Sequence, residues 1–179
     1  FARRRVERWA RGEGAADEDL IVGLAVLCHD FGKPATTRWL RGRLRSPGHD
    51  LAGVEPTLAF LRRLTNEERI LKEVPPLVAH HMQPFALWKA HAGDAAIRRL
   101  ALRVGRIDRL IRVAQADDEG RGAEIRDDAK AGEELRWLAA EAERLRLAAA
   151  RPRPILMGRD LIALGYAPSP QFKVWLDAC

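Results

Sequence analysis

The sequence predicts an all-α protein built around one main domain. Three observations lead to this prediction: apolar residues recur at helical spacing, alternating β-branched segments are almost absent, and Gly and Pro separate the apolar segments. With 179 residues, 47% hydrophobic and 31% charged, the chain has the composition of a globular domain with one core.

A buried central helix is expected near the start of the chain. The acidic residues at 17–19 would begin it, because carboxylates complement the dipole of a helix N-terminus. The segment 20–28 is apolar nearly all round, as in a helix covered on every side. We expect the helix to stop within 31–34, where Gly32 suits the position after a helix and Pro34 cannot continue it.

The later helices are predicted from the same signals. Ser46 would cap a helix with Pro47 in its first turn, and this helix would continue to Leu61 with a bend or a new start at Pro56. The remaining expected helices are 66–72, 75–82, two over 95–116 that break near Gly105, and a long surface helix over 133–150.

Two units are expected along the chain. Residues 151–154, Arg-Pro-Arg-Pro, break the preceding helix and have the composition of a linker. The segment that follows contains several Gly and Pro residues and predicts a short helical appendage. We therefore expect a main domain over 1–150 and a tail over 151–179.

Charge and cysteine content limit the function classes. The net charge of +6 and pI near 10.0 fit a nucleic-acid partner, and they fit equally an arginine-rich protein without one. Two cysteines, Cys28 and Cys179, form no disulfide framework, so a reducing cytoplasm is expected. No apolar run approaches the roughly 20 residues of a membrane span, and no membrane partner is expected.

The most informative polar residues are His29 and Asp30, which lie side by side at the end of the buried helix. Most His-Asp pairs are surface residues without a shared role. Here the apolar residues before the pair predict a buried position, and a buried charge is costly unless it is paired or bound to a metal. The pair therefore predicts a metal site.

Asp117 and Asp118 form a second polar feature. The apolar stripe of the preceding helix, projected from Leu110 and Ala114, arrives at Asp117; projected from Ile111 and Ala114, it arrives at Asp118. Periodicity predicts that one aspartate points inward and does not decide which. The alternative is a solvated helix end.

Two further histidines become candidates once a metal is placed at His29. His49 and His81, taken singly, are more often ordinary hydrogen-bonded histidines, but beside a metal they are candidate ligands of a second ion or partners of the residues that hold the first. His80 is expected to face water, and His91 is expected to lie in a loop without a role in the site.

Several segments resemble a known family. Residues 27–34, Leu-Cys-His-Asp-Phe-Gly-Lys-Pro, are similar to the signature of the HD-domain metal-dependent phosphohydrolase superfamily. Segments similar more narrowly to the C-terminal HD domain of bacterial CCA-adding tRNA nucleotidyltransferases are 46–53, 77–81 and 116–121, and those similar to its tail are 154–165 and 168–172. The resemblance implies an HD-type helical bundle.

The resemblance also implies a divalent metal ion (Mg, Mn, Ni or Co). In this family pattern His29, Asp30 and Asp117 hold the ion. His49 and His81 bind a second ion or the substrate phosphate, or protonate the leaving oxygen.

Further roles follow from the same resemblance. Asp30 would orient or deprotonate the attacking water, and Lys33 and Arg121 would supply positive charge to a phosphate. The implied activity is hydrolysis of nucleotide or RNA-end phosphoesters, such as 2′,3′-cyclic phosphates, with tRNA as a partner.

One departure from the family pattern concerns a further metal-binding histidine, which the family supplies upstream of the HD pair. No histidine precedes His29 here. We therefore expect a fragment that begins just after that ligand, that follows an upstream nucleotidyltransferase domain in the parent protein, and that is inactive if the ligand is essential. The alternatives are a non-catalytic tRNA-binding module with a vestigial metal site and a (p)ppGpp or dNTP hydrolase, which the tail disfavours.

Overall fold

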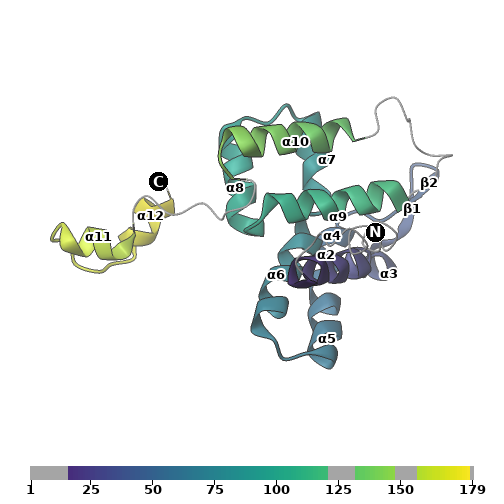
Figure 1. The fold of residues 1–179 in the computed structure, drawn as a ribbon, viewed down its shortest axis with the longest axis horizontal. Coiled ribbons are helices and arrows are strands. Elements are labelled where there is room, and N and C mark those ends of the chain that lie inside the picture. Colours follow the sequence, from purple (N-terminus) through teal and green to yellow (C-terminus); the bar gives the residue numbers. More distant parts are fainter. Residues whose placement is uncertain (1–15, 121–131, 148–156, 178–179) are drawn as a thin grey trace.

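The computed structural model describes residues 16–120, 132–147 and 157–177. They form a helical bundle with one small hairpin, which confirms the prediction of an all-α protein (Figure 1). The elements are α2 (Ala16–Cys28), α3 (Lys33–Thr36), β1 (Arg38–Leu40), β2 (Arg43–Arg45), α4 (His49–Ala52), α5 (Val54–Leu64), α6 (Glu68–His80), α7 (Gln83–Lys89), α8 (Asp94–Val104), α9 (Ile107–Gly120), α10 (Glu133–Arg144), α11 (Gly158–Ala163) and α12 (Gln171–Asp177).

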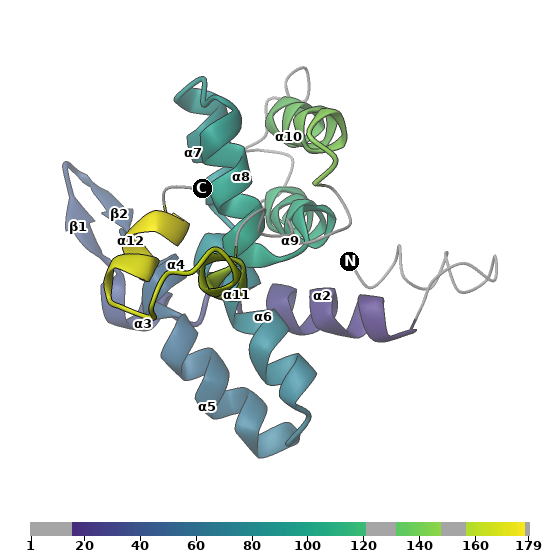
Figure 2. The same cartoon turned by 90° about the vertical axis from the view of Figure 1, so that its left-hand side faces the viewer.

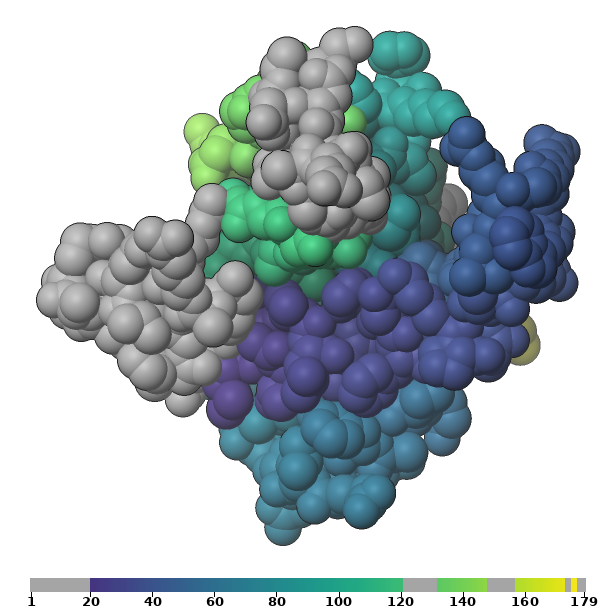
Figure 3. Space-filling view, turned by 90° about the vertical axis from the view of Figure 1, so that its right-hand side faces the viewer, coloured from purple at the N-terminus to yellow at the C-terminus, as the bar shows by residue number. Residues whose placement is uncertain are grey.

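The core lies where α2 packs against α6 and α9 (Figures 1 and 2). Helix α5 covers α6 on one side, and α10 covers α7 and α9 on the other. On the face in Figure 3, α2 forms a purple band between the green α9 and the blue α5–α6 region. None of the helices in the described part of the chain has the length and apolar character that a membrane span needs.

Helix α2 is the predicted central helix, and it ends at Cys28, close to the expected stop. One face carries Ile21, Val22, Ala25 and Cys28, all buried. Leu27 is exposed, so the expectation of a helix covered on every side is wrong. Exposed apolar residues are common on folded proteins, and an apolar run can therefore overstate burial.

Gly32 serves a different purpose from the one expected. Its backbone is right-handed, with φ −81° and ψ −13°, so it is not a left-handed helix C-cap. A Cβ added there would lie 2.0 Å from the His49 carbonyl oxygen and 2.6 Å from the Gly53 nitrogen. Glycine is needed because another backbone segment approaches closely. This contact brings the His29–Asp30 turn against α4.

The hairpin of β1 and β2 was not predicted. Its strands pair antiparallel, with Trp39 opposite Leu44, and Arg41 and Gly42 form the turn. Both turn residues have positive φ, 51° and 73°, as in the two-residue turns that match strand twist. The sequence signal for this hairpin was the Arg41-Gly42 pair between two short segments of apolar and basic residues.

The start of α4 also differs from the prediction. Gly48, with φ 72°, precedes the helix, and no side chain caps it. Instead, the Ser46 hydroxyl hydrogen-bonds the Thr37 hydroxyl at 2.7 Å. The expected new helix start near Pro56 is confirmed, because α5 begins at Val54 after Gly53.

The predicted helices 66–72 and 75–82 are one helix, α6, with Pro75 and Pro76 inside it. Each proline removes a backbone donor, but Val74, Pro75 and Val78 are buried in the core, and this packing offsets the lost bonds. Helix α7 follows and was not predicted, although Pro84 in its first turn is a typical start signal.

The break near Gly105 is confirmed, because this residue, with φ 75°, separates α8 from α9. Helix α10 ends at Arg144, before the predicted position 150. It is not only a surface helix, because Leu135, Leu138 and Ala142 are buried.

The tail contains α11 and α12, as the expected helical appendage requires. Their aromatic side chains pack together, with ring centroids 5.3 Å apart for Tyr166 and Trp175 and 5.9 Å apart for Phe172 and Trp175. The expected boundary after residue 150 falls in 148–156, outside the described residues.

Candidate metal centre

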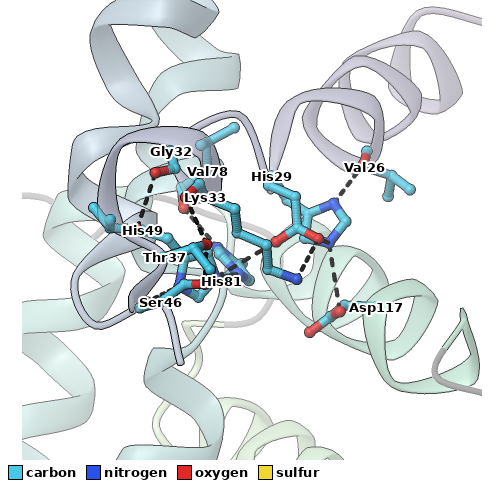
Figure 4. A network of polar contacts seen from close by, with 12 residues as sticks. Val26, His29, Gly32, Lys33, Thr37, Ser46, His49, Val78, His81 and Asp117 are labelled. Carbon is cyan, nitrogen blue, oxygen red and sulfur yellow. Dashed lines mark hydrogen bonds and ion pairs between the residues drawn. The ribbon is translucent and has the colours of Figure 1, made fainter. Parts of the chain in front are cut away.

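Five of the predicted site residues lie together, although they come from distant parts of the sequence (Figure 4). They are His29 and Asp30 in the turn after α2, His49 at the start of α4, His81 directly after α6, and Asp117 in α9. Side chains from or directly beside four helices therefore meet in one cluster, which we call the histidine cluster.

The ligand-type atoms of the cluster are close to one another. The shortest separations are 3.2 Å between the Nε2 atoms of His49 and His81, 3.2 Å between His29 Nε2 and Asp30 Oδ2, 3.4 Å between His29 Nε2 and Asp117 Oδ1, and 3.5 Å between His49 Nε2 and Asp30 Oδ1. Asp30, His49 and His81 offer three such atoms that all lie within 4.8 Å of one another.

The orientation of all three imidazoles has one cause. Each Nδ1 lies within hydrogen-bond distance of the carbonyl three residues earlier: His29 to Val26 at 2.7 Å, His49 to Ser46 at 2.8 Å, and His81 to Val78 at 2.8 Å. A carbonyl only accepts, so each Nδ1 carries the proton and donates it. The neutral rings therefore direct their unprotonated Nε2 atoms into the cluster.

This arrangement leaves negative potential that a cation would balance. The Nε2 lone pairs of His49 and His81 face each other, and such a contact is unfavourable without a proton or cation between them. Asp30 Oδ1 is buried and lacks a hydrogen-bond partner. Imidazole nitrogen with carboxylate oxygen is a common donor set for divalent transition metals, so these residues fit a metal ion.

The pKa values of the histidines differ with their surroundings. Burial opposes protonation of His29, but its hydrogen bond with Asp117 and the nearby charge of Asp30 outweigh burial and raise its pKa above 6.5. His81 is fully buried, and burial lowers its pKa. The two pKa shifts therefore have opposite directions because the carboxylates lie beside His29, whereas burial dominates at His81.

Lys33 lies at the exposed edge of the cluster. Its Nζ is 2.6 Å from Asp30 Oδ2, so a cationic side chain already contacts the carboxylate that points toward His29. The predicted phosphate-binding residue Arg121 lies outside the described residues.

The structure places Asp117, and not Asp118, beside His29. Neighbouring helix residues point about 100° apart, and Asp118 turns away from His29. It lines a hollow of about 350 Å³ together with Gln115 and Arg136. Helical periodicity did not decide which of the two aspartates points inward, and the packing of α9 against α2 decides it.

The other histidines lie outside the cluster. His91 is exposed just after α7, as expected. His80 does not simply face water: it is half-buried, its Nδ1 is buried without a partner, and burial together with Arg103 lowers its pKa. Cys28 is buried beside Thr57, and burial raises the pKa of its thiol to about 11, so it behaves as a small apolar residue.

Two curated proteins resemble the chain in sequence. The A-adding tRNA nucleotidyltransferase of Deinococcus radiodurans is 33% identical over 162 residues, which cover 87% of this chain and 36% of that protein. The chain is related to tRNA nucleotidyltransferases. The Multifunctional CCA protein of Halorhodospira halophila is 32% identical over 134 residues, 68% of this chain and 30% of that protein.

This nucleotidyltransferase-related chain spans about a third of the length of the two relatives. No family model and no solved structure matches it. The predicted relation to CCA-adding enzymes is therefore supported by sequence relatives, and the narrower HD-domain assignment stays a prediction.

His91 provides a negative control for the cluster. Replacing His91 with alanine is expected to change the affinity for an added divalent ion by less than about twofold, because the side chain is exposed and lies outside the cluster. Its backbone φ of 47° makes asparagine the milder second replacement. Titration of bound metal by both variants checks this expectation, and a changed stoichiometry would contradict the placement of the site.

Proposed function

We propose that the chain is a metal-dependent phosphohydrolase domain of a tRNA nucleotidyltransferase-like protein and acts on nucleotide or RNA-end phosphoesters, including 2′,3′-cyclic phosphates. The observation that carries the proposal is the histidine cluster, in which three imidazoles with fixed Nδ1 protons meet two carboxylates. The whole protein would add an upstream nucleotidyltransferase domain and tRNA as a partner, and residues 151–179 would form its tail.

In this proposal His29, Asp30 and Asp117 hold a divalent ion, and His49 and His81 bind a second ion or the substrate phosphate. A bound divalent ion lowers the pKa of water and polarises a phosphoryl oxygen. The hydrogen bonds from each Nδ1 to a backbone carbonyl keep the ring planes fixed, as they do in known metal-binding histidines.

The remaining roles belong to side chains at the edge of the cluster. Asp30 accepts a hydrogen bond from the attacking water and orients or deprotonates it, since no hydrogen bond occupies Oδ1. Lys33, which contacts Oδ2, offers charge to the phosphate oxygens. When protonated, His49 Nε2 can donate to the leaving oxygen, because its Nδ1 already donates to Ser46.

The deciding experiment is a hydrolysis assay with the 179-residue chain. Adenosine 2′,3′-cyclic phosphate and bis(p-nitrophenyl) phosphate are incubated with Mn²⁺, Ni²⁺, Co²⁺ or Mg²⁺, and with EDTA as a blank. Turnover with at least one ion and none with EDTA is expected. Metal binding without turnover on any phosphoester would refute catalysis by this chain.

A second candidate function is a non-catalytic tRNA-binding module. The ion pair between Lys33 and Asp30 favours it, because a lysine ammonium already balances that carboxylate without any metal. A module of this kind would bind tRNA and give no turnover. Including (p)ppGpp and dNTPs in the assay separates a third candidate, a nucleotide-sensing hydrolase, which would prefer these over RNA ends.

Metal binding has a readout that does not depend on activity. A ligand at 100 times its Kd stabilises the native state by about 2.7 kcal/mol, so saturating Mn²⁺ or Ni²⁺ is expected to raise the thermal midpoint by several degrees. Because the metal-free pKa of His29 is raised above 6.5, a proton competes with the metal below that raised pKa. The rise in thermal midpoint that the metal causes is therefore expected to become smaller as the pH falls through the raised pKa of His29. A midpoint that rises equally at pH 5 and pH 8 would contradict histidine ligation.

A further inference from the structure

The strands β1 and β2 contribute no side chain to the core or to the histidine cluster. The hairpin projects from the bundle beside α3 and α4 (Figures 1 and 3). A two-stranded hairpin with little support from packing is only marginally stable, so its exposed side chains call for a functional account.

The hairpin is strongly and uniformly basic. Its arginines, all exposed, are Arg38, Arg41, Arg43 and Arg45. No acidic residue occurs in the sequence between Asp30 and Asp50, and the ion pairs within the described ranges do not involve these four side chains. Arg38 lies opposite Arg45 in the register of the two strands. Like charges in this position destabilise a sheet, and a bound polyanion would relieve the repulsion.

An aromatic side chain accompanies these charges. Trp39 is 74% exposed, and its cross-strand neighbour Leu44 is 62% exposed. Strand alternation places this pair on one face of the hairpin and Arg38, Arg43 and Arg45 on the other. A basic ribbon with an exposed aromatic ring can contact phosphates around its edges while a base stacks on the ring.

The base of the hairpin is joined to the histidine cluster. Thr37 and Ser46, the residues that flank the two strands, are joined by a hydroxyl–hydroxyl hydrogen bond. The carbonyl of the same Ser46 accepts the Nδ1–H of His49, which fixes that ring. A nucleic-acid strand bound along the hairpin would therefore reach the histidine cluster with one of its ends.

We infer that the β1–β2 hairpin binds single-stranded RNA, with bases stacked on Trp39 and phosphates held by the hairpin arginines. Single-stranded RNA is favoured over a duplex, because a stacking ring needs an unpaired base and the major groove of A-form RNA does not admit side chains. A protein partner fits less well, since four arginines within residues 38–45, with no carboxylate among them, match the single-sign charge of a phosphate backbone. The placement of the RNA end at the histidine cluster rests on the proposed function. The binding of RNA to the hairpin does not depend on it.

The first test measures affinity without any metal. The 179-residue chain, in EDTA, is titrated into fluorescein-labelled 12-nucleotide oligouridylate, and fluorescence anisotropy is read at several salt concentrations. Arg43→Ala/Arg45→Ala is compared with Arg62→Ala/Arg63→Ala, which removes equal charge from exposed positions in α5. The hairpin variant is expected to bind about tenfold more weakly with a salt slope lower by about 1.4, and the control to change less than about threefold.

The second test addresses stacking. Trp39→Leu is expected to weaken binding by about fivefold or more, whereas Trp39→Phe, which keeps a stacking ring, retains most of the affinity. Circular dichroism should be unchanged in all variants, because the replaced side chains are exposed. Equal affinities for the hairpin and α5 variants, or tighter binding of blunt RNA duplex than of oligouridylate, would overturn the inference. Unchanged affinity of Trp39→Leu would also overturn it and leave the Trp39–Leu44 face to a protein partner.

A third measurement links the hairpin to the cluster. Arg43→Ala/Arg45→Ala is expected to raise KM about tenfold for a 12-nucleotide RNA that ends in a 2′,3′-cyclic phosphate. The same variant should leave KM for adenosine 2′,3′-cyclic phosphate unchanged, because a mononucleotide does not extend to the hairpin. Equal effects on KM for both substrates would overturn the placement of the RNA end at the histidine cluster. If no turnover is found, RNA binding in EDTA still tests the inference about the hairpin.

Discussion

Replacing Asp30 with asparagine is expected to reduce metal-dependent hydrolysis by about a thousandfold, as is typical when a group that orients or deprotonates the attacking water is lost. Asp30 approaches both His29 and His49, and its Oδ1 is buried without a hydrogen-bond partner. The amide keeps the shape but removes the negative charge. Initial rates with Mn²⁺ over a range of substrate concentrations measure the loss, and the fall should appear in kcat.

The same variant should fold normally. The ion pair with Lys33 that it removes is partly exposed, and such pairs contribute at most about 1 kcal/mol to stability. Asp118→Asn is the matched control, because Asp118 is half-buried and turns away from His29. An Asp30→Asn chain that hydrolyses phosphoesters at the parental rate would refute the role assigned to Asp30.

Replacing Gly32 with alanine is expected to lower the free energy of unfolding by about 1–3 kcal/mol, the usual cost of overpacking. The new Cβ would lie 2.0 Å from the His49 carbonyl oxygen, so α4 must move away from the turn after α2. His49 would then move relative to Asp30. A displacement of about 1 Å can reduce catalysis about a hundredfold, so we expect hydrolysis and metal binding to weaken together.

Two other glycines provide a graded comparison. A Cβ at Gly53 would meet the His49 oxygen at 3.1 Å, whereas a Cβ at Gly120 would meet nothing within 4 Å. Urea unfolding should therefore rank the alanine variants Gly32, Gly53 and Gly120 from most to least destabilised. A Gly32→Ala chain as stable as Gly120→Ala would show that the close approach of α4 does not hold the cluster together.

Much of the cluster could be predicted from single residues. His29 and Asp30 follow an apolar helix, and such a position makes an isolated surface role improbable. His49 and His81 became candidates only in combination with a metal at His29 and Asp30, because a single histidine in a helix carries little information, and the resemblance then implied their roles. Each prediction was local, and none supplied a distance.

The errors have a common physical cause. Two helices were predicted where α6 is one, because Pro75 and Pro76 were expected to break an isolated helix. The tertiary packing of Val74 and Val78 overrides this local propensity. Gly32 was interpreted as the residue that follows a helix, whereas glycine is required there by the close contact with α4, a segment that begins 17 residues later. The hairpin was missed because its two strands have three residues each, too few for an alternating pattern to be recognised.

The sequence by itself determined the helical class, the central helix that ends at Cys28, the break at Gly105 and the residue types of the cluster, since these depend on periodicity and on local backbone preference. Only the tertiary structure decided that Asp117 and not Asp118 faces His29, and that Trp39 is left exposed on a basic hairpin. Those outcomes depend on how helices rotate and pack against one another. The free energy of that packing is summed over contacts between distant segments, which no single stretch of sequence contains.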